Sequence, residues 1–189
     1  RPTQTEGPLN QADAIAETGT EAGQTANFDY FDKFSFAFWI KPRHGTGTIL
    51  SKMQDTARAE GYAVRLEEGR VQVLLVKRWL DDAIRAHTAQ PLPLDRWSHV
   101  AVTYDGSRLA KGIQVHVDGE PVAMTVQLDL FNQTFASAGP FRIGQGGGQG
   151  SGLHGELDDL RIYDRCLPPE TVLLLATKTP LDAILQTPP

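Results

Sequence analysis

The residues with the most evident binding chemistry lie in one short segment, 78–87, where a tryptophan stands among charged and hydrogen-bonding side chains. Its candidate ligand-binding residues are Arg78, Trp79, Asp82, Arg85 and His87. Sugar rings stack on indole faces, and carboxylates together with guanidinium groups hydrogen-bond to hydroxyls. The segment therefore favours recognition of a carbohydrate. The alternative is that Trp79 tucks under its loop and only stabilises it locally.

Catalytic patterns are missing from the sequence. The glycine-rich stretch 144–152 would need a following helix and a Lys-Ser or Lys-Thr pair to cradle a phosphate, and we expect a strand after it. No Gly-x-Ser-x-Gly nucleophile elbow occurs. Cys166, the single cysteine, excludes an internal disulfide and has no base near it in the sequence, so we expect a buried structural thiol. We predict that the chain is not an enzyme.

Two histidines, His99 and His116, are expected on the polar face of a hairpin. If Tyr104 pairs with Ile113, then Ala101 faces His116 and His99 is its diagonal neighbour, at roughly 7–8 Å. Two imidazoles at that distance suit a transition metal, but no third ligand is evident. The alternative is that both histidines pack or hydrogen-bond on the sheet surface.

The segment 96–122 has the clearest strand pattern. Apolar and polar residues alternate on both of its arms, which indicates two half-buried antiparallel strands. Further strands are expected at 14–16, 34–40, 48–51, 62–66, 71–78, 83–89, 125–130, 141–143 and 155–163. The strand 34–40 is apolar on both faces, so it is expected to be central and covered on both sides, with Trp39 and Trp97 in the core. A short helix should start near Pro169. The pattern predicts an all-β, two-sheet antiparallel sandwich with one short C-terminal helix.

Composition excludes several classes of function. The formal net charge is −5 and no basic stripe is present, which argues against nucleic acid. No apolar run approaches the roughly 20 residues of a membrane helix. The chain starts at Arg1, so we expect a fragment or a processed product. Residues 1–12 are interpreted as a tail, 13–176 as one domain and 177–189 as an exit linker.

A family resemblance follows from the order of these segments. FSFAFWIKP, RWSHVAVTYDGS, GIQVHVDGEPV, FRIGQGGG and GELDDLRIYDRCLPPE together resemble the laminin-G-like domains of the concanavalin A-like lectin/glucanase superfamily. The segment RWLDDAIRAH is similar to that of a subgroup embedded in large secreted bacterial proteins with cytochrome-c-like segments. The resemblance implies a jelly roll with one curved, concave sheet, in an extracytoplasmic (periplasmic, secreted or cell-surface) protein.

The resemblance also implies a metal. Many members of the family hold a structural calcium ion, for which Asp158 is the candidate ligand, with Asp159 as the neighbouring alternative and backbone carbonyls from 17–27 completing the site. By parity with Leu160 and Ile162, Asp158 is expected to point inward, where an uncompensated carboxylate is costly. The competing interpretation is a β-bulge at 158–159 that turns the carboxylate onto backbone N–H groups or Arg161.

The expected function is therefore a non-catalytic module that recognises carbohydrate or a protein surface. The glucanase branch of the resembled superfamily carries Glu-x-Asp-x-x-Glu on one strand, and this motif is absent: Glu156-x-Asp158 lacks the third acid, and Glu67-Glu68 falls at a turn. The alternatives are a structural spacer that packs against neighbouring domains of its own chain and a degenerate glycoside hydrolase.

Overall fold

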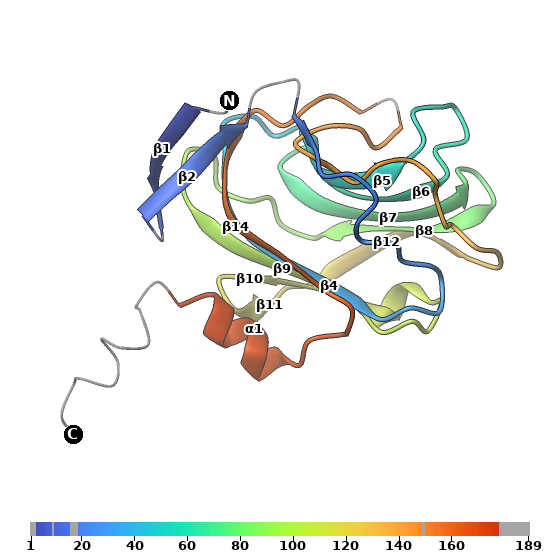
Figure 1. Cartoon of the computed structure of the whole chain (residues 1–189). Helices are drawn as coiled ribbons and strands as arrows, with labels where there is room; N and C mark the ends of the chain where they lie inside the picture. The colour runs from blue at the N-terminus through green and yellow to red at the C-terminus, as the bar shows by residue number, and fades with distance from the viewer. Residues whose placement is uncertain (1–2, 9, 16–18, 149, 178–189) are drawn as a thin grey trace.

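Two seven-stranded antiparallel sheets form the layers of the computed structural model (Figure 1). The structure describes residues 3–8, 10–15, 19–148 and 150–177. The first sheet consists, in spatial order, of β1 (Thr3–Gly7), β2 (Asn10–Ile15), β14 (Gly155–Tyr163), β4 (Phe34–Pro42), β9 (Ser98–Tyr104), β10 (Ile113–Val117) and β11 (Glu120–Pro121). The second sheet consists of β12 (Met124–Leu130), β8 (Asp82–Thr88), β7 (Arg70–Arg78), β6 (Gly61–Glu67), β5 (Gly47–Met53), β13 (Arg142–Ile143) and β3 (Thr20–Glu21).

The main core lies between the two sheets, because alternate residues of each strand turn inward. In β4, Phe34, Phe36, Phe38 and Ile40 all enter this core. From the second sheet come inward-facing residues of β5, β6, β7 and β8, including Leu50, Tyr62, Val64, Leu66, Val71, Val73, Leu75 and Ile84. Opposite-facing residues on the same strands are therefore left to line the two outer faces. The expected two-sheet sandwich is confirmed.

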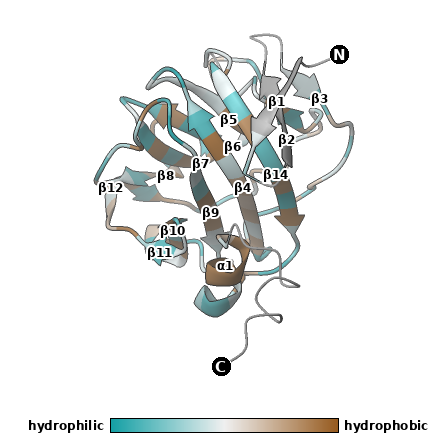
Figure 2. Ribbon diagram, turned by 90° about the vertical axis from the view of Figure 1, so that its left-hand side faces the viewer, coloured by the Kyte–Doolittle hydropathy of each residue, from teal (hydrophilic) through white to brown (hydrophobic). Residues whose placement is uncertain are grey.

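The outer face of the first sheet is covered by α1 (Pro169–Leu175), drawn in red beside β10 and β11 (Figure 1). Ala37 and Ala101 pack there against Leu167 and Val172. The helix starts hydrophilic and becomes hydrophobic along its length (Figure 2). Ser35 anchors the approach to α1, since its hydroxyl donates to the carbonyl of Arg165 at 2.8 Å and accepts from the N–H of Leu167 at 3.0 Å. A short 3₁₀ helix, Ala110–Gly112, links β9 to β10.

The N-terminal segment differs from the expected tail. Thr3–Gly7 and Asn10–Ile15 form the antiparallel hairpin β1–β2, which extends the first sheet by pairing with Gly155–Leu157 of β14. The strand expected at 14–16 is thus, as far as residue 15, the end of a longer strand, and residue 16 lies outside the described residues. Polar composition concealed it, because pairing with β14 supplies hydrogen bonds that local sequence does not show. Of the expected exit linker 177–189, only Thr177 lies within the described residues.

Candidate functional site

The candidate site lies on the outer face of the second sheet. Leu74 and Val76 of β7 alternate with the core residues and face outward, where they join Met53, Ala63 and Ala83 in an apolar cluster. Trp79 follows the end of β7 and packs against this cluster. Its indole is partly buried, so part of the ring stays accessible. The tryptophan therefore both stabilises the face locally and presents an aromatic surface.

Two arginines lie over the Trp79 ring. The guanidinium carbon of Arg85, on β8, is 4.6 Å from the ring centroid, and that of Arg65, on β6, is 5.7 Å from it. Cation–π attraction favours both arrangements. The pKa of Arg65 is lowered by burial and further by the charge of Arg85, while Glu67 acts in the opposite direction. The face thus carries two mutually repelling cations beside one indole.

A hydrogen-bonded row crosses β6, β7 and β12 next to Trp79. Arg65 Nε donates to Gln72 Oε1 at 2.5 Å, and its Nη2 donates to Glu67 Oε1 at 3.3 Å. Gln72 Nε2 donates to Glu67 Oε2 at 2.6 Å and to Gln127 Oε1 at 2.7 Å. Gln72 is buried and Gln127 is exposed. Donors and acceptors are therefore fixed in place across three strands, which is the polar pattern that ligand sites use for orientation.

Two hollows flank this row. A pocket of about 300 Å³ is lined by Arg65, Trp79, Thr56, Ala57, Ala59, Gly147 and Gly148. A more polar one of about 450 Å³ is lined by Glu67, Glu68, Arg70, His87, Ala89, Thr125 and Gln127. Small-molecule sites span roughly 300–1,000 Å³, so each hollow has room for a ligand of sugar size.

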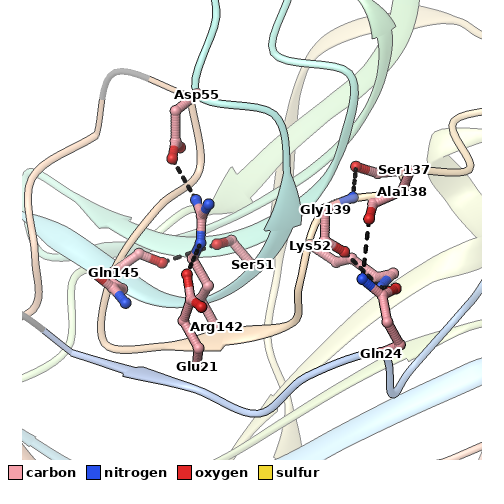
Figure 3. Close-up of polar contacts among 10 residues, drawn as sticks. All are labelled: Glu21, Gln24, Ser51, Lys52, Asp55, Ser137, Ala138, Gly139, Arg142 and Gln145. Carbon is pink, nitrogen blue, oxygen red and sulfur yellow. Dashed lines mark hydrogen bonds and ion pairs between the residues drawn. The ribbon is translucent and has the colours of Figure 1, made fainter.

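Side-chain contacts hold the loop walls of the Trp79 pocket (Figure 3). Arg142 forms ion pairs with Asp55 of the β5–β6 loop and with Glu21 of β3, the latter at 3.3 Å. Across the glycine-rich loop, Ser51 Oγ donates to the carbonyl of Gln145 at 2.8 Å, and Thr48 Oγ1 donates to that of Gly146 at 2.7 Å. The two loops that close the pocket are thus attached to β5 and β13. The glycine-rich stretch serves as a wall, consistent with its lack of a phosphate-binding pattern.

A buried lysine attaches a second loop in the same region (Figure 3). Lys52 Nζ donates to the carbonyl of Gly139 at 2.7 Å and to Gln24 Oε1 at 3.2 Å. Burial lowers the pKa of Lys52. Gln24 in turn donates from Nε2 to the carbonyl of Ala138. These contacts hold the segment after β3 against the loop before β13, and none of these residues lines the Trp79 pocket.

The structure separates the residues selected from the sequence. Trp79 and Arg85 come together, and His87 lines the second pocket on the same face, with Nδ1 2.9 Å from the carbonyl of Thr88. Arg78 is exposed and pairs with Asp81 at 2.9 Å. Asp82 is buried, and its Oδ1 accepts from the N–H of Asn132 at 2.7 Å. By alternation it faces away from Arg85, which explains why it does not join the site.

Arg65, Gln72 and Gln127 were not among the residues predicted from the sequence. A signal was present: Arg65 lies between the inward-facing Val64 and Leu66, and Gln72 lies between Val71 and Val73. A polar residue on a strand whose other face is apolar points out of the core. What the sequence did not contain was the order of the strands, which places β12 beside β8 and brings Gln127 to Gln72.

The strands that carry His99 and His116 have the expected register, but the two side chains are buried instead of lying on the sheet surface. Ile113 faces Tyr104 and His116 faces Ala101, as predicted. Both imidazoles are buried, however, and not on an open surface. Burial lowers the pKa of His99 to about 4 and also lowers that of His116. Among the described residues, no group of three or more His, Cys, Asp or Glu side chains could hold a metal ion.

A β-bulge interrupts β14 at the expected position. The register with β4 shifts between Asp158 and Arg161, and Asp159 has a φ of 50°. Leu157 faces Ile40 in the core, so Asp158, which faces Trp39, lies on the outer side and is partly buried. The predicted inward direction was wrong, because the bulge breaks the parity with Leu160 and Ile162.

Asp159 and Glu156 form ion pairs with basic side chains, and the other candidate residues differ in how deeply they are buried. Asp159 accepts from Arg161 Nε at 2.8 Å. Glu156 is buried between Arg43, at 2.7 Å, and Lys41, at 3.5 Å. Trp39 is buried as expected, whereas Trp97 is only partly buried and does not join the core. Cys166 is a free, partly buried thiol, less enclosed than expected.

Comparisons with known proteins agree with this architecture. Residues 16–173 match the family model Laminin_G_3, described as the concanavalin A-like lectin/glucanases superfamily. The adhesion G-protein coupled receptor V1 of Danio rerio is 24% identical over 139 residues, which is 71% of this chain but 2% of the receptor. No helix in the described part of the chain is long and apolar enough to cross a membrane.

Solved structures resemble the chain in fold. Domain 4 of AbnA, a GH43 extracellular arabinanase from Geobacillus stearothermophilus, solved in complex with arabinotriose, has a TM-score of 0.63 at 17% identity; the match covers 94% of this chain and 82% of that one. The CBM40 of the Ruminococcus gnavus IT-sialidase, bound to alpha2,3 sialyllactose, has a TM-score of 0.64 at 15% identity. The match covers 92% of this chain and 97% of that one. At these identities the likeness concerns the fold alone.

Proposed function

Since the chain belongs to the concanavalin A-like lectin/glucanases superfamily through its Laminin_G_3 domain, we propose that it is a non-catalytic module that binds carbohydrate on the outer face of the second sheet. The observation that carries the proposal is the partly exposed Trp79 ring beside a pocket and a fixed row of amide, carboxylate and guanidinium groups. Aromatic faces stack on sugar rings, and such polar rows orient hydroxyls. The arabinotriose and sialyllactose complexes of the similar domains support it.

The proposal is tested by calorimetry against a broad panel of neutral and acidic polysaccharides. We expect Trp79→Ala to weaken binding by about tenfold or more, since buried aromatic anchors dominate such interfaces. Phe31→Ala is the control, because Phe31 is an aromatic side chain that is 63% exposed and does not line either pocket. If no polysaccharide binds, or if Trp79→Ala binds as the wild type does, the proposal is wrong.

A structural spacer is the second candidate. Leu173 and Leu174 on α1 are 50% and 61% exposed, which suits a contact with a neighbouring domain or protein surface. Replacing both with Gln should leave stability nearly unchanged in the isolated domain. A longer chain that includes the flanking sequence should lose stability in the same variant. Equal stability of wild type and variant in both lengths would exclude this role.

A structural calcium ion at Asp158 is also proposed. Acidic groups alone do not form the site in the described residues, so backbone carbonyls would have to supply most ligands, as calcium permits. We expect millimolar calcium to raise the melting temperature of the wild type but not of Asp158→Asn. Asp164→Asn, at an exposed position on the same chain segment, is the control. If calcium does not raise the melting temperature of the wild type, the proposed calcium site is wrong.

The location of the parent protein is proposed to be extracytoplasmic. Its support is the similarity to a domain of an extracellular arabinanase. The subgroup with cytochrome-c-like segments stays a prediction from the segment RWLDDAIRAH. Sequencing of the flanking regions and fractionation of cells that express the full-length protein would test both.

A further inference from the structure

The two arginines beside Trp79 differ in their partners. Arg65 donates to Gln72 and Glu67. Arg85 forms no ion pair with any described residue, and its Nε is buried without a hydrogen-bond acceptor. A guanidinium group carries five N–H donors, and leaving such donors desolvated and unsatisfied is costly. Stacking on Trp79 compensates for only part of this cost.

The surrounding charge makes this arrangement unusual within the chain. The protein has a formal net charge of −5, and other arginines on the same sheet have acidic partners: Arg78 pairs with Asp81, and Arg142 with Glu21 and Asp55. Glu67 is shared between Arg65 and Gln72 and is not bonded to Arg85. Of these four arginines, Arg85 is therefore the one without a carboxylate partner among the described residues.

We propose that the outer face of the second sheet selects acidic glycans, with Arg85 and Arg65 binding a carboxylate or sulfate group of a sugar that packs beside Trp79. This inference rests on the proposed function and adds the class of ligand to it. A planar guanidinium group matches the two oxygens of a carboxylate, and the bond is strengthened where water is partly excluded. The exposed Gln127 amide, which the buried Gln72 holds in place, binds a hydroxyl group of the same sugar unit.

Matched pairs of polysaccharides test the inference at about 0.15 M salt. Polygalacturonate is compared with its fully methyl-esterified form, and dextran sulfate with dextran. We expect one acidic member to bind about tenfold more tightly than its neutral partner, and the pair that shows this preference identifies the anion. Raising the salt to about 0.5 M should reduce the preference, because partly exposed charges are screened.

Two variants distinguish the specific effect of Arg85 from the effect of removing any one positive charge. Arg85→Gln should remove the preference, because it weakens the binding of acidic glycans more than that of their neutral partners. Arg96→Gln removes one positive charge at a side chain that is 70% exposed and pairs with Asp118, which follows β10 of the first sheet, and it should change neither affinity. If Arg85→Gln fails to fold, Arg85→Lys keeps the charge without the planar fork and should retain only part of the preference.

The outcomes distinguish the inference from the proposed function. Equal binding of acidic and neutral glycans, abolished by Trp79→Ala, overturns the inference and leaves carbohydrate binding in place. Binding of poly-glutamate as tight as that of the acidic glycan overturns the assignment to sugars. No binding of any polysaccharide overturns both.

Discussion

His99 and Trp39 lie opposite each other on β9 and β4, with ring centroids 5.3 Å apart and planes at 66°. This edge-to-face contact belongs to a layer buried on the outer side of the first sheet. His99 is 1% exposed, and among the described residues its Nδ1 has no hydrogen-bond partner. The imidazole is thus held in its neutral form by burial.

This layer predicts a loss of stability in weak acid. The pKa of His99 is about 4 when folded, against 6.5 for the free side chain. Between these values the unfolded chain binds the proton and the folded chain does not, so stability is full above about pH 6.5 and falls as the pH drops toward 4. The loss approaches about 3 kcal/mol, measured by urea unfolding at several pH values.

The histidine contribution is isolated by comparison of variants. His99→Phe should flatten the pH dependence between 4 and 6.5 relative to the wild type. His44→Phe removes an exposed imidazole and should leave the wild-type slope unchanged. Equal slopes for wild type and His99→Phe would contradict the prediction.

Gly148 is predicted to keep the Trp79 pocket open. Its φ is +80°, and an added Cβ would lie 3.1 Å from the Cβ of Ala59, which also lines the pocket. Gly148→Ala should cost about 1 kcal/mol of stability through backbone strain and should also weaken glycan binding. Gly23→Ala is the matched control, because Gly23 has a similar φ of +68° but an added Cβ would have no atom within 4 Å. Similar binding by both variants would show that the pocket wall is not part of the site.

Arg142 is predicted to act as a positioning residue for the same pocket. Arg142→Gln removes its ion pairs with Asp55 and Glu21, so hydrogen exchange should accelerate in the β5–β6 loop and in the glycine-rich loop. Glycan affinity should fall while the melting temperature changes by only a few degrees. Arg161→Gln, which loses the surface pair with Asp159, should show neither effect. Unchanged exchange in both loops would reject the role.

Much of the fold could be read from the sequence because local alternation determines strand faces. The facing of His116 and Ala101 follows from the pairing of Tyr104 with Ile113, and both hold in the structure. Burial of the histidines could not be read in this way. It depends on the outer side of this sheet being covered, as where Val172 of α1 packs near Ala101, and that contact joins residues about seventy positions apart.

The candidate site likewise has a part that local sequence predicts and a part that depends on the order of the strands. Trp79 follows β7 and Arg85 lies on β8 of the same hairpin, so their proximity could be anticipated from their spacing. Arg65 and Gln127 come from strands on either side of that hairpin, and only the strand order brings them to Gln72. The bulge at Asp159 was foreseen as an alternative, but the resulting change of face at Asp158 required the register to be known.

The position of β14 between β2 and β4 has a consequence for synthesis of the protein. Among the described residues, β14 is the strand synthesised last, yet it lies inside the first sheet and joins the N-terminal hairpin to the rest. Until residue 163 has emerged, β4 has an open edge and the hairpin has no partner. Nascent chains are therefore expected to depend on chaperones that shield strand edges, and truncation before Gly155 should give aggregation in place of a smaller domain.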